Sequence, residues 1–312
     1  DLTAKLVKLV QAMQEIKAEE DSRVNSYEIF VNQKQTHIRN SRGVDVTFSG
    51  FDCEIEVVTN SRKDEHEIEI YKDLRFSDTS AEKIIAEVRG MFHTGRQRLN
   101  AVPTRQNEHA DVLLTGNAVG SFFQYFAMHT NASYQYMGVA KAKIGEAITG
   151  ADADPLNIRL VPTLDGSAKN APYDETGMPA AERVLFENGI CRSYWGSLQH
   201  AHYIGMKDTT SMNNMVVEGG SKTLDELRSM PHIEITDFSA FDMDAVSGTC
   251  GGEIRLAYES DGTTSHPTTS GSLSARYDDV LKNLTFSKET QQINNRVVPC
   301  AVLLRDVTVA GE

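Results

Sequence analysis

The chain has 312 residues, of which 40% are hydrophobic and 24% charged, and this balance is typical of a globular protein with room for two domains. The 44 Asp and Glu against 31 Lys and Arg give a net charge of −13, which disfavours a nonspecific nucleic-acid role because phosphates need basic partners. Four widely spaced cysteines, no signal-peptide pattern and no apolar run of about 20 residues predict reduced thiols and a cytoplasmic location.

Residues 1–105 predict an α+β domain, made of a helix, an antiparallel meander and a second helix. An amphipathic first helix is predicted by apolar residues at helical spacing, namely Leu2, Leu6, Leu9, Met13 and Ile16. Period-two alternation then predicts strands at 27–31, 35–39, 44–49, 53–59 and 66–71. The second helix is expected from residue 80 to 92, with Thr79 or Ser80 as its cap, and Pro103 marks a linker.

Residues 106–312 predict a second domain that is mostly antiparallel β. Strands are expected at 111–115, 156–161, 184–186, 190–195, 232–238, 252–258 and 297–309. A turn at 173–179 precedes a hairpin whose Asn188-Gly189 turn is the strongest such signal in the chain, because both residues accept positive φ. Helices are predicted at 121–128, which is rich in aromatic residues, at 223–228 with Ser221 as cap, and at 278–284.

The residues alone assign no catalytic group, because Gly-x-Ser-x-Gly, phosphate-loop and dinucleotide patterns are all absent. One metal site remains as an alternative. His200 and His202 would face the same side of a strand, and His129 or Cys250 could supply a third ligand from a distance. For His129 itself, packing in the core of the aromatic helix is the favoured interpretation.

Two glycine pairs are candidate peptide-binding positions: Gly219 with Gly220, and Gly251 with Gly252. Glycine lets a second backbone approach closely, and a β-rich domain offers sheet edges to which an extended peptide can add as a strand. The alternative is that these glycines only form turns.

Several short segments, in their order and spacing, resemble the TldD/TldE (PmbA/TldD) family over essentially the whole chain. They are Asn-Ser-Arg-Gly at 40–43, Lys-Ile-Gly-Glu at 143–146, Asp-Glu-Thr-Gly-Met-Pro at 174–179, Phe-Glu-Asn-Gly at 186–189, Asn-Asn at 213–214, Glu-Gly-Gly at 218–220, Thr-Leu-Asp-Glu-Leu at 223–227 and the segment 299–311. Peptidase members also carry a His-Glu-x-x-x-His zinc motif. Residues 121–129 stand in its place and keep only His129, so the chain is similar to the TldE side of the pair, which lacks the metal residues.

The resemblance implies a PmbA/TldD-like α+β fold, in which residues 1–105 are the second half of the family's N-terminal domain and 106–312 its C-terminal domain. It also implies that the chain is N-terminally short. The implied function is a TldE/PmbA-like, non-catalytic subunit of a dimeric metallopeptidase complex for peptide maturation or degradation. Its partner would be a TldD-like zinc subunit or a second copy, with zinc in the partner, no cofactor in this chain, and no nucleic acid or membrane. A metallopeptidase in its own right with an altered metal site, or a stand-alone peptide-binding protein, are the alternatives.

Overall fold

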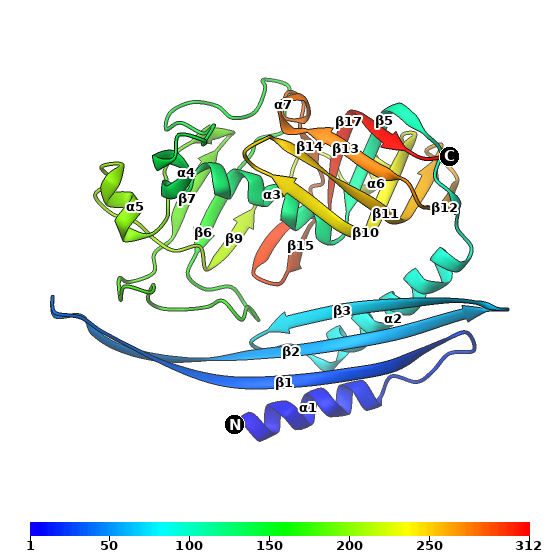
Figure 1. Cartoon of the computed structure of the whole chain (residues 1–312), viewed down its shortest axis with the longest axis horizontal. Helices are drawn as coiled ribbons and strands as arrows, with labels where there is room; N and C mark the ends of the chain where they lie inside the picture. Colours follow the sequence, from blue (N-terminus) through cyan, green and yellow to red (C-terminus); the bar gives the residue numbers. More distant parts are fainter. The chain divides into compact units, whose positions relative to one another are not determined.

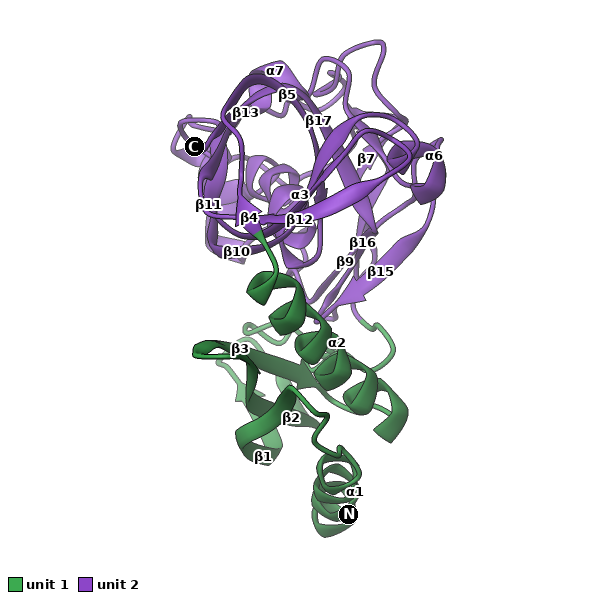
Figure 2. Cartoon of the chain, turned by 90° about the vertical axis from the view of Figure 1, so that its right-hand side faces the viewer, with its two compact units in different colours: residues 1–101, 163–177 green, residues 102–162, 178–312 purple.

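The structure, a computed structural model, describes residues 1–312, and the α+β fold class predicted from the sequence is confirmed. The chain divides into two compact units, coloured green and purple in Figure 2. Unit 1 contains residues 1–101 and 163–177, and unit 2 contains residues 102–162 and 178–312. The segment 163–177 thus belongs to the first unit, whereas the predicted boundary after residue 105 places it in the second domain.

Unit 1 is a three-stranded antiparallel sheet with two helices (Figure 1). In sheet order the strands are β1 (Ser22–Arg39), β2 (Asp45–Lys63) and β3 (His66–Phe76), and the helices are α1 (Leu2–Gln14) and α2 (Ala81–Leu99). Every second side chain of β2 from residue 53 to 61 is buried, because strand alternation places these residues on one face, where Ile55 and Val57 pack against both helices. Ser80 caps α2 as predicted, accepting a hydrogen bond from the Lys83 N–H at 3.2 Å.

The first two strands of unit 1 are longer than predicted. The segments 27–31 and 35–39 are parts of one strand, β1, and the segments 44–49 and 53–59 are parts of β2. The pairing runs from Ser22 opposite Ser61 to Arg39 opposite Asp45, with one irregularity near Val24. The polar residues 32–34 do not end the strand, because residues 50–52 face them in register and keep the ladder unbroken.

The returning segment ends in the predicted turn. The Asp174 carboxylate accepts hydrogen bonds from the Thr176 N–H at 2.8 Å and the Thr176 hydroxyl at 2.7 Å, and the Gly177 N–H donates to the Asp174 carbonyl at 3.1 Å. Gly177 has φ +81°, and a Cβ there would lie 2.3 Å from Val44 Cγ1. Only glycine therefore allows this turn to pack on the end of the β1–β2 hairpin.

Five strands of unit 2 close into a ring in the order β10, β5, β17, β13, β11 and back to β10. Figure 2 views this ring through its opening. They are β5 (Asn107–Thr115), β10 (His232–Asp244), β11 (Thr249–Ser260), β13 (Ser272–Arg276) and β17 (Ala301–Ala310). Three short strands extend the ring: β4 (Val102–Pro103), β12 (Ser265–Thr269) and β14 (Thr285–Phe286). Closure pairs the backbone edges that an open sheet would expose.

A second, six-stranded sheet completes unit 2. In sheet order its strands are β15 (Thr290–Ile293), β16 (Arg296–Pro299), β9 (Asn214–Val217), β6 (Ile158–Val161), β7 (Arg183–Glu187) and β8 (Ile190–Cys191). Helix α3 (Asn117–His129) contacts β5 and β10 of the ring and β16 of this sheet, so it lies between the two. The other helices are α4 (Ala132–Tyr136), α5 (Leu198–Tyr203), α6 (Leu224–Arg228) and α7 (Tyr277–Val280). None of the helices has the length and apolar character that crossing a membrane requires.

Pairing in unit 2 is mostly antiparallel, as predicted, with parallel pairs at β5–β10, β4–β12 and β9–β16. The hairpin turn is confirmed, with φ +51° at Asn188 and +76° at Gly189. Its second strand ends at Cys191, earlier than the predicted residue 195. The predicted strand 297–309 is two strands, β16 and β17, which are interrupted at Cys300 and belong to different sheets.

Helix α6 begins one residue later than predicted, and its cap lies two residues later. Its N-cap is Thr223, not Ser221, and Thr223 forms a reciprocal capping box with Glu226. The Ser221 hydroxyl donates instead to the Asp154 carboxylate at 2.5 Å.

Candidate functional site

Helix α3 is the most deeply buried element of unit 2 that carries a candidate site residue. It begins after Gly116, whose φ is +65° and where a Cβ would lie 2.6 Å from the Thr236 carbonyl oxygen. The helix is apolar on nearly all sides, which is typical of a helix enclosed by a core. Its buried residues are Ala118, Val119, Gly120, Phe122, Phe123, Tyr125, Phe126, Ala127 and His129.

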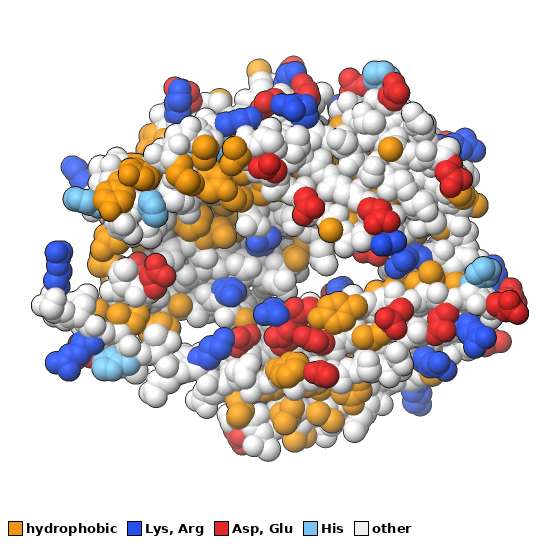
Figure 3. Space-filling view, in the orientation of Figure 1, with side chains coloured by type: hydrophobic (Ala, Val, Ile, Leu, Met, Phe, Trp, Pro, Cys, Tyr) orange, Lys and Arg blue, Asp and Glu red, His pale blue; other side chains and the backbone are white.

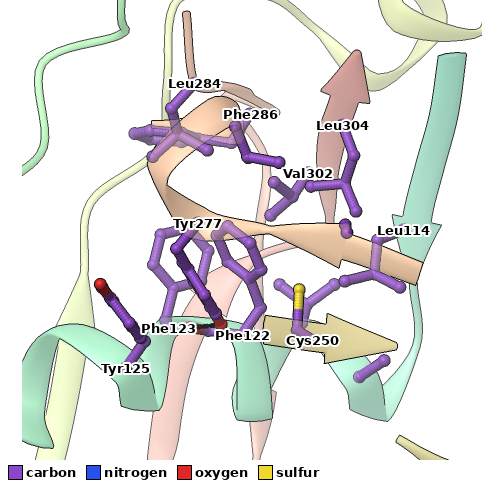
Figure 4. Packing of buried hydrophobic residues seen from close by; sticks show 14 of the residues in the cluster. Leu114, Phe122, Phe123, Tyr125, Cys250, Tyr277, Leu284, Phe286, Val302 and Leu304 are labelled. Atoms are coloured by element: carbon purple, nitrogen blue, oxygen red, sulfur yellow. Dashed lines mark hydrogen bonds between the residues drawn. The ribbon is translucent and has the colours of Figure 1, made fainter. Parts of the chain in front are cut away.

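Aromatic rings fill the space around this helix (Figure 4). Tyr277 stacks on Tyr125 with ring centroids 3.7 Å apart and on Phe122 at 4.9 Å. Its hydroxyl donates to the Phe122 carbonyl at 2.9 Å, whereas the buried Tyr125 hydroxyl has no hydrogen-bond partner. Each such side chain stabilises the fold by about 1.5–3 kcal/mol through burial alone, so this packing has a structural role whatever the function.

His129, at the end of α3, is fully buried and held in its neutral form. Its Nδ1 accepts a hydrogen bond from the Lys141 backbone N–H at 3.1 Å, and its ring contacts that of Tyr125 with centroids 4.2 Å apart. Burial, reinforced by the charge of Lys141, lowers the pKa of His129 to about 4. With Nδ1 as acceptor, the neutral ring carries its proton on Nε2, which forms no hydrogen bond of standard geometry, although a contact with the Ala245 backbone partly opposes the lowering of the pKa.

Cys250, on β11, is joined to this cluster through the two tyrosines. It contacts Tyr277, Tyr277 stacks on Tyr125, and Tyr125 contacts His129. Burial raises the pKa of Cys250 to about 12, so the thiol is protonated at neutral pH in this core. No group of three or more His, Cys, Asp or Glu side chains is arranged to hold a metal ion.

The predicted strand carrying His200 and His202 is wrong, because both residues lie on helix α5. Successive helical residues are about 100° apart, so positions i and i+2 point to nearly opposite sides and cannot face one metal ion. The His200 ring instead lies at the start of its own helix, with Nδ1 2.9 Å from the hydroxyl of the N-cap Ser197.

The four candidate glycines are approached closely, but by the backbone of this chain. A Cβ would lie 2.0–2.2 Å from a carbonyl oxygen of unit 2 at each of Gly219, Gly220, Gly251 and Gly252. Gly251 and Gly252 lie within β11, paired with β10 on one side and β13 on the other. Gly251 and Gly252 therefore present no free sheet edge, and the close approach at Gly219 and Gly220 comes from the Lys288 and Phe286 carbonyls of the same chain.

Arg296 is a functional candidate that the sequence analysis did not name. Its side chain runs from β16 to α3, where Nη1 donates to the Gly120 carbonyl at 3.2 Å and Nη2 to Gln124 Oε1 at 2.8 Å. Its Nε is buried without a hydrogen-bond partner, and burial lowers its pKa. One signal was available: Arg296 is the only charged residue between 290 and 300.

Comparison with known proteins identifies the class of fold. A sequence profile of the PmbA/TldA metallopeptidase C-terminal domain matches residues 107–311, which cover the ring, α3 and the six-stranded sheet. The chain therefore belongs to the PmbA/TldD family, a family of metallopeptidase type. Comparison with curated proteins gives no match.

Solved structures share the fold at low sequence identity. A protein of Thermotoga maritima described as a candidate modulator of a DNA gyrase aligns with a TM-score of 0.82 at 17% identity, over 99% of this chain and 74% of that one. TldE of Thermococcus kodakarensis aligns with a TM-score of 0.76 at 18% identity, over 99% and 74%. A candidate gyrase modulator of Bacteroides thetaiotaomicron aligns with a TM-score of 0.75 at 16% identity, over 100% and 72%.

The family implies zinc, but the residues of α3 do not fit a zinc ion. In a His-Glu-x-x-x-His motif ending at His129, the first His and the Glu would be residues 124 and 125, where this chain has Gln124 and Tyr125. The Gln124 amide is bound by the Arg296 guanidinium, a positive charge that opposes a cation at this place. Burial also raises the pKa of Tyr125 above its usual value, so Tyr125 cannot replace a carboxylate base. We therefore assign no catalytic step to a metal in this chain.

Proposed function

We propose that this protein is a TldE/PmbA-like, non-catalytic subunit of a metallopeptidase complex for peptide maturation or degradation in the cytoplasm. The proposal rests on which residues α3 carries at the positions of the peptidase motif. Gln124 and Tyr125 stand where the peptidase motif has His and Glu, and Arg296 places a positive charge on the first of these positions. The zinc ion and the peptide-cleaving base then belong to a TldD-like partner subunit.

An exposed apolar patch on unit 2 supports association with such a partner. We define the α4–α5 patch as Tyr136, Met137, Leu198 and Tyr203, which are 57%, 58%, 47% and 52% exposed. The rings of Tyr136 and Tyr203 lie 5.1 Å apart, and Figure 3 shows hydrophobic side chains gathered on this face over α4 and α5. A contiguous exposed patch of this kind is typical of a protein–protein interface, with a TldD-like chain or a second copy as its occupant.

We propose further that a peptide bound by the complex is held extended, as an added strand. The closed ring offers no edge among its five strands, whereas the six-stranded sheet ends at β15 and β8. β15 has four residues and pairs on one side only, with β16, so it is an edge of unit 2 to which a strand can add.

Co-purification followed by elemental analysis tests the proposed function. The tagged chain, co-expressed with a TldD-like zinc subunit, should form a dimer that cleaves peptides, and the isolated chain should contain substoichiometric zinc and cleave none. Tyr136→Ser should weaken the dimer, because it removes an aromatic ring from the α4–α5 patch. Tyr71→Ser is the matched control, since Tyr71 is also 57% exposed but lies on β3 of unit 1.

The opposite result is equally well defined. One zinc per isolated chain, with peptide cleavage lost in both His129→Asn and Cys250→Ser, would establish a peptidase in its own right. A monomer that ignores the zinc subunit at micromolar concentration would instead favour a stand-alone peptide-binding protein.

A further inference from the structure

The Arg296 guanidinium is fixed in one orientation beside α3. Its contacts with the Gly120 carbonyl and the Gln124 amide oxygen use one N–H of Nη1 and one of Nη2. Both acceptors are uncharged. The Nε–H and one N–H on each Nη therefore remain without a partner, and Nε is fully buried.

No carboxylate of unit 2 pairs with this charge. The four elements around it, α3, β9, β15 and β16, contain no Asp or Glu, although the chain as a whole has 44. A buried charge without a counter-ion is costly, and proteins normally pair it. Arg296 is half-buried, is held in place by two hydrogen bonds and has no anion beside it, although the chain is acidic; this points to an anion supplied from outside.

We propose that Arg296 binds a carboxylate of a bound peptide. A carboxylate presents two coplanar oxygens that match the parallel N–H groups of a guanidinium, and such bidentate pairs are among the strongest hydrogen-bonded contacts in proteins. Gln124 orients the guanidinium by accepting a hydrogen bond from Nη2. The choice of a peptide as the source of the carboxylate rests on the proposed function, whereas the anion site itself rests only on Arg296 and its uncharged surroundings.

The test is a binding measurement on the full chain without any partner subunit. The probes are three N-terminally labelled alanine tetrapeptides carrying an uncharged dye: one with a free C-terminal carboxylate, one amidated, and one amidated with Asp at the third position. In fluorescence anisotropy the free-acid peptide should bind about tenfold tighter than the amide, which corresponds to about 1.4 kcal/mol. Recovery of this affinity by the Asp peptide would assign the site to a side-chain carboxylate, and no recovery would assign it to the peptide terminus; both results support the proposal.

Variants separate the anion site from a structural role. R296M should abolish the preference for the free acid, because it removes the guanidinium that binds the carboxylate. Q124E places a carboxylate on the guanidinium from within the chain, so it should raise the melting temperature and also abolish the preference. R159M is the matched control, since Arg159 already pairs with Glu182 at 3.3 Å and should leave the preference intact.

Equal binding of free-acid and amidated peptides, or no binding of either, overturns the proposal. A preference for the free-acid peptide that persists in Q124E also overturns the proposal. This test holds even if R296M fails to fold, because Q124E keeps the arginine and its contacts. If inorganic phosphate displaces the labelled peptides and the three peptides bind equally well, Arg296 binds a free inorganic anion, and the proposal of a peptide carboxylate is overturned. None of these outcomes alters the co-purification result, so the two proposals fail independently.

Discussion

Replacing His129 by Asn should remove a loss of stability that the buried imidazole causes in acid. The pKa of His129 in the folded chain is about 4, below the value of about 6.5 for an unfolded chain. Between these values the unfolded chain binds a proton that the folded chain does not, so the free energy of unfolding falls as the pH drops from about 6.5 towards 4 and is unaffected above. At pH 5 the two values correspond to a loss of about 2 kcal/mol relative to pH 8.

The assay is urea unfolding at pH 8 and at pH 5, followed by the fluorescence of Trp195. This is the only tryptophan, and its Nε1 donates to the Ala127 carbonyl of α3 at 2.7 Å, so its signal reports on the helix that carries His129. The Asn side chain keeps an acceptor for the Lys141 N–H and cannot titrate. Wild type should lose about 2 kcal/mol more than H129N between the two pH values, and the exposed control H202N should behave as wild type. Equal losses in wild type and H129N would refute the inference that His129 is buried and neutral.

Three further predictions concern stability. Y125F should raise the free energy of unfolding by about 1 kcal/mol, and with it the melting temperature, because it removes a buried hydroxyl that has no partner. Y277F should lower the free energy of unfolding by a similar amount, because it loses an existing hydrogen bond; changes of the same sign in the two variants would contradict this. G252A should prevent folding or lower the free energy of unfolding by several kcal/mol, since its Cβ would lie 2.0 Å from a carbonyl oxygen. G90A, on α2 with open space around it, should instead raise the free energy of unfolding by about 0.5–1 kcal/mol, as measured by calorimetry. T223A should cost about 1 kcal/mol in denaturant unfolding through loss of the α6 capping box, and an unchanged midpoint would show that α6 does not depend on its cap.

Local patterns in the sequence were sufficient to predict most elements but not their partners. The spacing of apolar residues gave α1 and α2, and Asn188-Gly189 gave the hairpin turn, because these signals act within a few residues. Closure of the ring joins β5 with β10, more than 100 residues later in the chain, and an alternating pattern says which face of a strand is buried but not which strand lies beside it. The length of β1 was missed for a related reason, since polar residues 32–34 stay extended only because β2 faces them.

The candidate site was predicted only in part. The sequence located the aromatic helix and His129, but it placed His200 on a strand although Ser197 is a good helix N-cap that precedes it. The close approach at the glycines was expected, but sequence alone could not show that the approaching backbone belongs to the same chain. Arg296 has no local motif, and its importance follows only from the absence of acidic residues on elements that are distant in sequence.

The position of β17 in the ring sets the order in which this protein can fold. Residues 301–310 come late in the sequence, yet β17 lies between β5 and β13, so the ring cannot close while these residues are still within the ribosome. Until then the buried face of β5, with Val112 and Leu114, lacks one of its two neighbouring strands. Contacts between such distant segments form slowly, and a nascent chain that waits for β17 exposes an apolar sheet edge to other chains. Expression at low temperature or with a chaperone should therefore raise the soluble yield more for this domain than for unit 1, whose strands follow one another directly.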